Sequence, residues 1–141
     1  MSVVPFRKEH FFAIQPQRAQ SHVPASVDES VLDALEKNGA SFTCIVDGEP
    51  VMCFGWSPIY PTRAAIWGYL SKDAGRHMVR LTRIGRDLAH NLNFKRLEIE
   101  VDYGFREGYR WARLMGFKLE VPRLEAYNAQ GGATALYVRL K

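Results

Sequence analysis

Three acidic side chains alternate with apolar ones in the segment Arg96–Asp102, and they are the best candidates in the sequence for acid–base chemistry. In an extended strand, Glu98, Glu100 and Asp102 lie on one face, because successive side chains point to opposite faces. If that face is buried, the carboxylates raise one another's pKa, and one of them suits a general base near neutral pH. If it faces water, they form a solvated surface beside Arg96. Both interpretations are open.

A row of arginines offers a second kind of chemistry, the binding of phosphates. Arg76, Arg80 and Arg83 recur at helical spacing, and such a row could follow a nucleic-acid backbone. However, Asp87 interrupts the row, and the formal net charge of +4 is modest for a nucleic-acid protein. A nucleic-acid partner is therefore not expected, and the alternative is a solvated helix face.

Histidines and cysteines show no pattern that would hold a metal. The four histidines have no ligand spacing with Cys44 and Cys53, so we predict no metal site. The two cysteines lie in segments joined by Asp47-Gly48, a dipeptide typical of tight hairpins. They share a face if the hairpin loop has two or four residues, and they lie on opposite faces if it has three. Both are expected to be reduced and buried.

The elements that must position these residues follow from the periodicity of apolar side chains. Strands are predicted at Ser2–Pro5, Ser41–Val46, Pro50–Trp56, Ala64–Leu70, Arg96–Asp102, Lys118–Glu125 and Ala133–Leu140. Helices are predicted at Glu9–Gln15, from the capping box of Ser26 and Glu29 to a stop at Asn38-Gly39, at about Asp73–Asn91, and at Arg106–Met115. The segment Gln17–Ala25 is predicted to be a loop. This order indicates an α+β protein with a mixed, mostly antiparallel, twisted sheet and helices on both faces.

Length and composition set the size and class of the protein. With 141 residues, 47% hydrophobic and 24% charged, the chain suits one globular domain spanning residues 1–141. No apolar run approaches the ~20 residues that cross a bilayer, and no signal-peptide pattern opens the chain. We therefore expect a soluble, cytoplasmic protein.

The stretch Arg96–Glu120 (RLEIEVDYGFREGYRWARLMGFKLE) resembles the C-terminal half of the GCN5-related N-acetyltransferase (GNAT) superfamily. There, a strand leads into a helix that ends in a leucine-glycine-phenylalanine-like signature, here Leu114-Met115-Gly116-Phe117, with Gly116 as the left-handed stop. The segment Ala135–Leu140 resembles the closing strand of that family. The resemblance covers roughly residues 40–141 and implies a GNAT-type acyl-CoA N-acyltransferase fold. More narrowly, the pattern looks like small GNAT-like proteins of tailed bacteriophages, including an internal virion protein.

The resemblance also implies where coenzyme A would bind. In the family, a strand end and the next helix start hold the pyrophosphate with the consensus Gln/Arg-x-x-Gly-x-Gly/Ala, which the segment KDAGRH matches here. Lys72 keeps the cation and Gly75 the first glycine, whereas His77 replaces the second small residue and either blocks a phosphate or, when protonated, contacts it. The residues implied in coenzyme binding are Leu70, Lys72, Gly75, Arg76, His77 and Arg80. Alternatively, Gly75 only eases the helix start.

The family's usual acid, a tyrosine five residues before the signature phenylalanine, is replaced here by Ala112. Tyr109, one helical turn earlier, and Tyr103, at the end of the preceding strand, are the candidates to protonate a leaving thiolate, although both could instead be packing residues. Glu100 is the candidate base of the acidic strand.

Two functions are consistent with these residues. The first is an N-acyltransferase that uses acetyl-CoA, or another acyl-CoA, and an unknown amine acceptor. The alternative, motivated by Ala112 and His77, is a catalytically inactive GNAT-fold virion or assembly protein with other phage proteins as partners. A phage-encoded protein would lie in the host cytoplasm or in the virion, and a homo-oligomer is open in either case.

Overall fold

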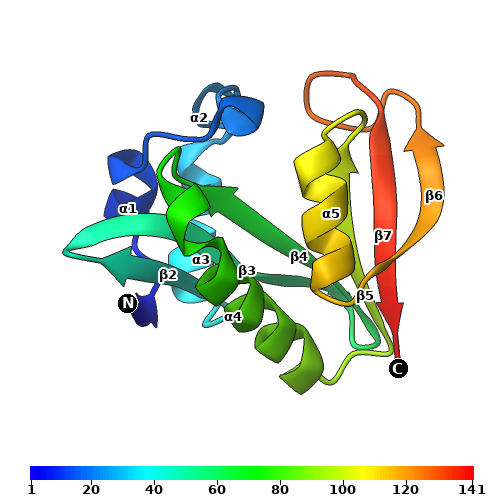
Figure 1. Ribbon diagram of the computed structural model, residues 1–141, viewed down its shortest axis with the longest axis horizontal. Helices are drawn as coiled ribbons and strands as arrows, with labels where there is room; N and C mark the ends of the chain where they lie inside the picture. The colour runs from blue at the N-terminus through cyan, green and yellow to red at the C-terminus, as the bar shows by residue number, and fades with distance from the viewer. The chain divides into compact units, whose positions relative to one another are not determined.

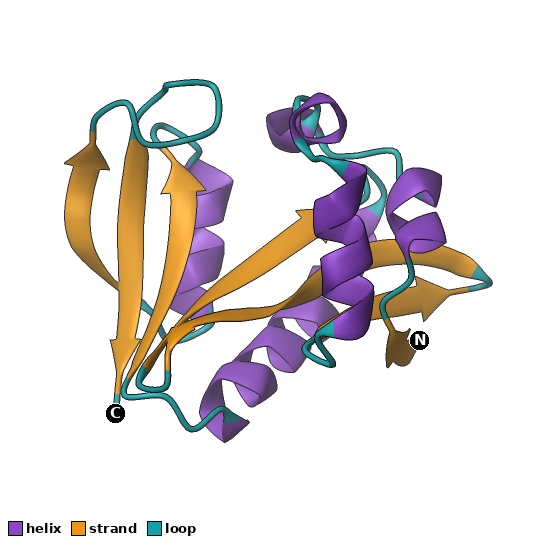
Figure 2. Cartoon of the chain, turned by 180° about the vertical axis from the view of Figure 1, so that it is seen from behind, coloured by secondary structure: helices purple, strands orange, loops and turns teal.

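The computed structural model describes all residues 1–141 as seven strands, five α-helices and two 3₁₀ helices (Figures 1 and 2). The strands are β1 (Ser2–Pro5), β2 (Ser41–Val46), β3 (Glu49–Tyr60), β4 (Arg63–Leu70), β5 (Arg96–Asp102), β6 (Lys118–Leu124) and β7 (Thr134–Leu140). The helices are α1 (Lys8–Ala13), η1 (Arg18–Gln20), α2 (Val23–Ser26), α3 (Glu29–Lys37), η2 (Ala74–His77), α4 (Met78–Asn91) and α5 (Arg106–Leu114). None of the helices has the length and apolar character needed to cross a membrane.

The strands form one sheet in the order β1-β2-β3-β4-β5-β7-β6. The pairs β1–β2, β2–β3, β5–β7 and β6–β7 are antiparallel, whereas β4 and β5 are parallel. The parallel pairing joins only Arg63–Ala65 to Arg96–Glu98, while the whole of β5 pairs with β7. The predicted α+β class with a mixed, mostly antiparallel sheet is therefore confirmed.

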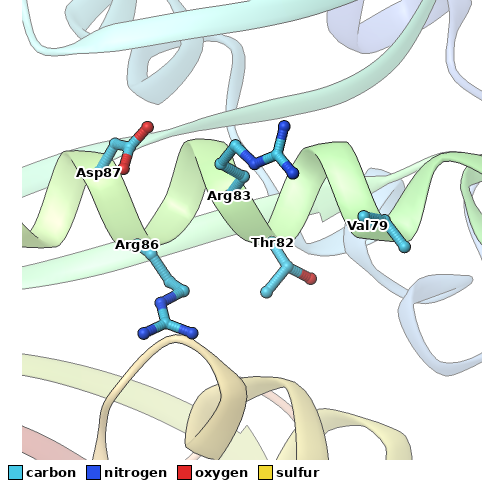
Figure 3. Close-up of a pocket in the computed structure, with 5 residues that line it drawn as sticks. All are labelled: Val79, Thr82, Arg83, Arg86 and Asp87. Carbon is cyan, nitrogen blue, oxygen red and sulfur yellow. The ribbon is translucent and has the colours of Figure 1, made fainter.

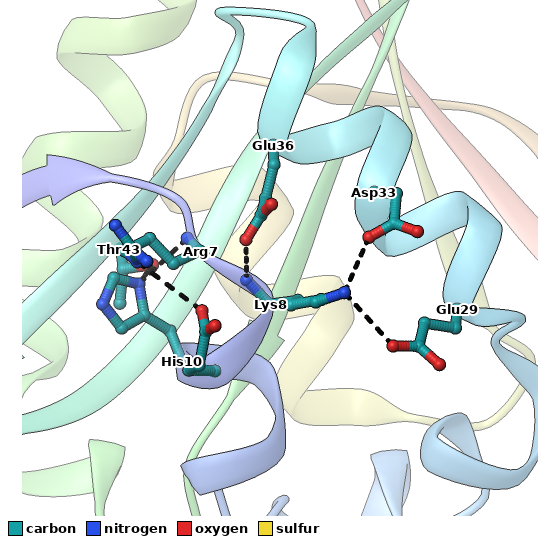
Figure 4. Close-up of polar contacts among 8 residues, drawn as sticks. Arg7, Lys8, His10, Glu29, Asp33, Glu36 and Thr43 are labelled. Carbon is teal, nitrogen blue, oxygen red and sulfur yellow. Dashed lines mark hydrogen bonds and ion pairs between the residues drawn. The ribbon is translucent and has the colours of Figure 1, made fainter.

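The chain divides into two compact units, and β3 and β4 each contribute residues to both. The first unit comprises Met1–Trp56 and Trp67–Arg76. Its buried cluster consists of Phe6, Phe11, Ile14, Leu32, Cys53 and Tyr69. In that cluster, the rings of Phe11 and Tyr69 stack with centroids 4.5 Å apart. Lys8 ties α1 to α3, because its ammonium group lies 3.2 Å from Glu29 and 3.0 Å from Asp33 (Figure 4).

The second unit comprises Ser57–Ile66 and His77–Lys141. Its helices α4 and α5 pack closely, because α4 carries Gly85, where a Cβ would collide with the side chain of Met115. The indole Nε1 of Trp111 on α5 donates a hydrogen bond of 2.8 Å to the Thr82 hydroxyl on α4. As predicted, α5 ends before Gly116, and Phe117 is buried. The two helices are thus held together by both packing and a directed hydrogen bond.

The N-terminal third departs from the prediction in two places. The segment expected as a loop contains η1 and α2, because Pro24 lies in the first turn of α2, where its missing N–H leaves no intrahelical bond unmade. Helix α3 is capped by Asp28 rather than Ser26: the Asp28 carboxylate accepts a 2.9 Å hydrogen bond from the amide of Ser30. Ser26 instead ends α2.

The hairpin between β2 and β3 has the expected two-residue turn, yet its cysteines lie on opposite faces. A bulge between Cys44 and Ile45 shifts the register, so that Thr43 lies opposite Cys53 and Cys44 opposite Met52. One extra residue in one strand moves every later side chain to the other face. Both thiols are free and buried, and burial raises the pKa of Cys44 to about 11 and that of Cys53 to about 12. They are therefore unreactive core residues.

Candidate functional site

The segment that follows β4 contains the residues expected to bind coenzyme phosphates. A Cβ built on Gly75 would meet nothing within 4 Å, so the backbone is open on that side. Lys72 and Arg76 are exposed on either side of Gly75. The preceding backbone is fixed, because the amide of Lys72 donates to the carbonyl of Gln15 at 2.8 Å. The segment thus presents exposed cations around an accessible, fixed stretch of main chain.

Leu70, also implied in coenzyme binding, has a different environment. Its side chain is buried, its amide donates to the Gln20 side chain at 2.9 Å, and its carbonyl accepts from the amide of Gln17 at 2.9 Å. Both main-chain groups of Leu70 are therefore used within the first unit.

Helix α4 has no acidic side chain at its N-terminus. His77 is its N-cap residue and makes no side-chain capping hydrogen bond, and the first turn contains no acidic residue. The first amides of a helix lack intrahelical acceptors, and they lie at the positive end of the helix dipole. Arg80, in this first turn, is exposed. The exposed Arg80, the positive end of the helix dipole and a first turn without a carboxylate fit the chemistry of a diphosphate.

The acidic face of β5 does not behave as three equivalent carboxylates. Glu98 is only 4% exposed and accepts two hydrogen bonds from Arg63, at 3.0 and 2.9 Å, and one from Arg96 at 2.6 Å. Burial opposes ionisation of Glu98, but the hydrogen bonds from these two arginines outweigh it and lower its pKa. Glu98 is therefore an ion-pair residue, and the three carboxylates are not buried together, because Glu100 is exposed.

Glu100 is the carboxylate of this face whose pKa is raised. Although the residue as a whole is exposed, desolvation of its carboxyl group and the negative charge of Glu98 raise its pKa, and a hydrogen bond with Tyr127 partly opposes them. Asp102, next along the face, accepts a 3.2 Å hydrogen bond from the Asn128 side chain. A raised pKa at an accessible carboxylate is the property of a general base.

Sequence reasoning did not single out Tyr127 and Asn128. They lie at the turn between β6 and β7, where the amides of both donate to the carbonyl of Gly132, at 2.8 and 3.1 Å. The polar, glycine-containing segment gave the position of the turn. It gave no indication that the turn reaches Glu100 and Asp102, because that depends on the pairing of β5 with β7.

The two candidate tyrosines have distinct environments. The Tyr109 hydroxyl oxygen accepts a 2.5 Å hydrogen bond from the amide of Gly104, which leaves its own proton free to donate. Tyr103 is half exposed, with the Arg123 guanidinium 4.4 Å from its ring centroid. Ala112, at the position of the family's usual acid, is buried.

The sequence matches no family model, and no curated protein matches it. Solved structures do match. Ard1 from Thermoplasma volcanium is 17% identical with a TM-score of 0.75, over 99% of this chain and 96% of that chain. An acetyltransferase of the GNAT family from Bacillus anthracis is 12% identical with a TM-score of 0.68, over 98% and 93%. A ribosomal-protein-alanine N-acetyltransferase from Brucella melitensis is 14% identical with a TM-score of 0.63, over 82% and 80%.

At these identities the likeness concerns the fold, and it extends over nearly the whole of this chain for the first two structures. The expectation drawn from the stretch Arg96–Glu120 is confirmed at this level. The chain has the fold of the GNAT acetyltransferases.

Proposed function

We propose that this protein is an acyl-CoA-dependent N-acyltransferase that transfers an acyl group, in the simplest case acetyl, to an amine. The observation that carries the proposal is the start of α4, which has no side-chain cap and no acidic residue in its first turn. A helix start without a side-chain cap, with the exposed Arg80 in its first turn, is suited to a diphosphate, and the chain has the fold of known acetyltransferases.

Several residues would hold the coenzyme. Lys72, Arg76 and Arg80 would balance its phosphate charge, and Gly75 lets the main chain approach closely. His77 would contact a phosphate when protonated. Acyl-CoA, when bound, supplies a thioester whose carbonyl carbon an amine can attack.

Glu100 and Tyr109 would carry the proton transfers. An amine acceptor is protonated near neutral pH, so it must lose a proton before its nitrogen can attack, and Glu100 is the accessible carboxylate with a raised pKa. Tyr109 would donate its free hydroxyl proton to the leaving thiolate, with Tyr103 as the second candidate. These roles extend the family's acid–base chemistry to a chain whose usual acid position holds Ala112.

The proposal is tested by calorimetric titration with acetyl-CoA. We expect saturable binding in the wild-type chain and at least tenfold weaker binding when Lys72 and Arg80 are both replaced by Gln, since two charge-assisted contacts are lost. Lys95→Gln, which removes one exposed charge beyond the end of α4, is a control and should bind normally. Absence of heat at millimolar acetyl-CoA would contradict the proposal.

The second candidate is a catalytically inactive GNAT-fold virion or assembly protein. The observation in its favour is the buried methyl group of Ala112 where the family's acid would lie. The two acetyltransferases named above come from Brucella melitensis and Bacillus anthracis, so they add nothing to a phage assignment. If the chain binds acetyl-CoA but acetylates none of a panel of peptides, polyamines and small amines, this candidate is favoured. Turnover with any of them removes it.

A further inference from the structure

The turn between β6 and β7 brings two side chains to the acidic face of β5. Figures 1 and 2 show α5 on one face of β5 and β7, and no helix of the second unit on the other face. Val101 points towards α5, because a Cβ added to Gly108 of that helix would lie 2.6 Å from Val101 Cγ1. Glu100 and Asp102, on either side of Val101 in the strand, therefore point to the face without a helix. On that face, the turn at residues 125–133 supplies neighbours to both carboxylates.

Asn128 organises this turn through its side chain. Its Oδ1 accepts hydrogen bonds from the amides of Gln130, at 3.1 Å, and Gly132, at 2.8 Å. Gly132 leaves room for the Asn128 amide, because a Cβ at that position would lie 2.9 Å from Asn128 Nδ2. The Nδ2 group donates a 3.2 Å hydrogen bond to Asp102, which attaches the turn to β5. The turn is thus closed by its own side chain and fixed to the acidic strand.

The backbone on either side of Tyr127 is fixed as well. Ala126 has a φ of 50°, in the left-handed region that residues other than glycine seldom adopt. The amide of Tyr127 donates to the carbonyl of Gly132 at 2.8 Å. Such a conformation persists only where the surrounding structure holds it, and it is frequent at functional sites. Tyr127 therefore lies between a constrained residue and the turn that Asn128 closes.

Tyr127 contacts Glu100 from this position. Its hydroxyl group and the Glu100 carboxyl group form a hydrogen bond. An ionised carboxylate can only accept, so the phenol donates, and Glu100 keeps its remaining lone pairs for another proton. The charged groups that face Glu100 are Glu98 and Asp102 on its own strand and Arg63 on β4. Because Arg63 donates both its hydrogen bonds to Glu98, Tyr127 is the neutral donor that orients Glu100.

Polar side chains also line a shallow hollow on α4, in the same unit, but they are not brought together there. The hollow is lined by Val79, Thr82, Arg83, Arg86 and Asp87. Figure 3 shows the Arg83 and Arg86 guanidinium groups on opposite sides of the helix, pointing away from each other. The turn between β6 and β7, in contrast, directs two side chains to neighbouring carboxylates.

We propose that Tyr127 is a positioning residue that holds the Glu100 carboxylate in the orientation in which it removes a proton from the acceptor amine. This role rests on the proposed acyl transfer and adds the turn between β6 and β7 to the residues that serve it. The proton moves from the ammonium nitrogen to a lone pair of Glu100, while the phenol keeps its own proton. By donating to the charged form, Tyr127 also favours the ionised carboxylate that acts as the base.

The first test follows Glu100 itself and needs no activity. The ¹³C NMR signal of the Glu100 carboxyl carbon gives the pH midpoint of its titration. Tyr127→Phe removes only the hydroxyl group, and we expect the midpoint to rise by roughly half a pH unit, because the charged form loses a donor. Tyr60→Phe, at an exposed tyrosine of the same unit, is the control and should leave the midpoint unchanged. Equal midpoints in the wild-type chain and in Tyr127→Phe would overturn the positioning role.

The second test measures the pH profile of acetyl transfer to the best acceptor of the amine panel. In Tyr127→Phe the rising limb of kcat should move to higher pH by the same amount as the NMR midpoint, with an unchanged KM for acetyl-CoA. Asn128→Ala, which loosens the turn, should move the limb in the same direction and add little to Tyr127→Phe, because both act through one contact. A loss of kcat at every pH with an unmoved limb would overturn the proposal in favour of a structural role.

Failure of the proposed function gives a different result. If the Glu100 midpoint responds to Tyr127→Phe but no amine is acetylated, the contact between the two residues stands. The acyltransferase proposal then fails, and the part of Tyr127 in catalysis fails with it.

Discussion

The helices of this chain begin in two different ways. At α1, the ring Nδ1 of His10 accepts a 3.1 Å hydrogen bond from the amide of Arg7, and at α3 the Asp28 carboxylate accepts from Ser30 (Figure 4 shows the first). At α4, the residue in the capping position is His77, and its ring makes no capping bond. The first two starts are capped by side chains of the protein, whereas α4 follows directly on the 3₁₀ helix η2 and has no side-chain cap.

Strand β5 shows the same contrast between two of its acids. Glu98 is buried and neutralised by Arg63 and Arg96, which lowers its pKa, while Glu100 is exposed and has a raised pKa. The same residue type two positions apart therefore has a structural role in one case and a candidate catalytic role in the other. Variants at Glu98, Glu100 and the helix starts test these differences in role.

The largest effect is expected from Glu100→Gln. If Glu100 is the base, kcat/KM for acetyl transfer should fall by about a hundredfold or more, since general bases contribute 10²–10⁴-fold. Because the charged form is the base, wild-type activity should rise with pH through the raised pKa of Glu100. That limb of the profile should disappear in the variant. Unchanged activity would exclude Glu100 as the base.

In contrast to Glu100→Gln, Glu98→Gln should lower the stability of the fold. Removing this buried charge leaves two arginines without their shared carboxylate, and we expect a loss of about 2 kcal/mol in the free energy of unfolding. That is less than the ~3–5 kcal/mol for a fully buried pair, because both guanidiniums are partly exposed. Urea unfolding of Glu98→Gln and Glu100→Gln side by side provides the comparison. Equal losses of stability in the two variants would contradict the distinction between them.

His77→Asp would give helix α4 the side-chain cap that it lacks. The new carboxylate should accept from the helix amides and raise the free energy of unfolding by about 1 kcal/mol, as a good cap does. It should also weaken acetyl-CoA binding about tenfold, because it occupies the amides and repels the diphosphate. His77→Asn separates capping from charge. Asp28→Ala is the matched control at α3: it should lose about 1 kcal/mol of stability and leave the affinity unchanged.

The sequence predicted the structure correctly where the pattern involves only neighbouring residues. The alternation of β5 and the stop of α5 at Gly116 each depend on neighbours within a few positions, and both are present. The cap of α3 was misplaced by two residues, because Ser26 and Asp28 are both good capping residues and only the course of the chain through α2 decides between them.

The candidate site was harder to predict, because its properties depend on distant pairings. Glu98 differs from Glu100 because the parallel pairing of β4 with β5 brings Arg63, 35 positions away in sequence, to Glu98. Tyr127 reaches Glu100 only through the turn that follows β6. No local pattern distinguishes two glutamates with the same alternation, so the sequence could not predict that Glu98 is paired with two arginines.

The smallest effect is expected at the start of α1, where the His10 side chain accepts a hydrogen bond from the Arg7 amide. His10 accepts at Nδ1 from the Arg7 amide and lies 2.8 Å from the Thr43 hydroxyl, while Glu9 and Glu36 are the nearby acids. Burial, and then the charge of Arg7, lower the pKa of His10 from 6.5. The unfolded chain therefore takes up a proton more readily than the folded one.

The contribution of His10 to the free energy of unfolding should therefore be largest above pH 6.5. It should decline as the pH falls towards the lower pKa of the folded state. Urea midpoints between pH 7.5 and pH 5.5 should decrease in the wild-type chain more than in His10→Asn, which keeps an acceptor but does not titrate. Equal decreases in the wild-type chain and in His10→Asn would contradict this account of the α1 start.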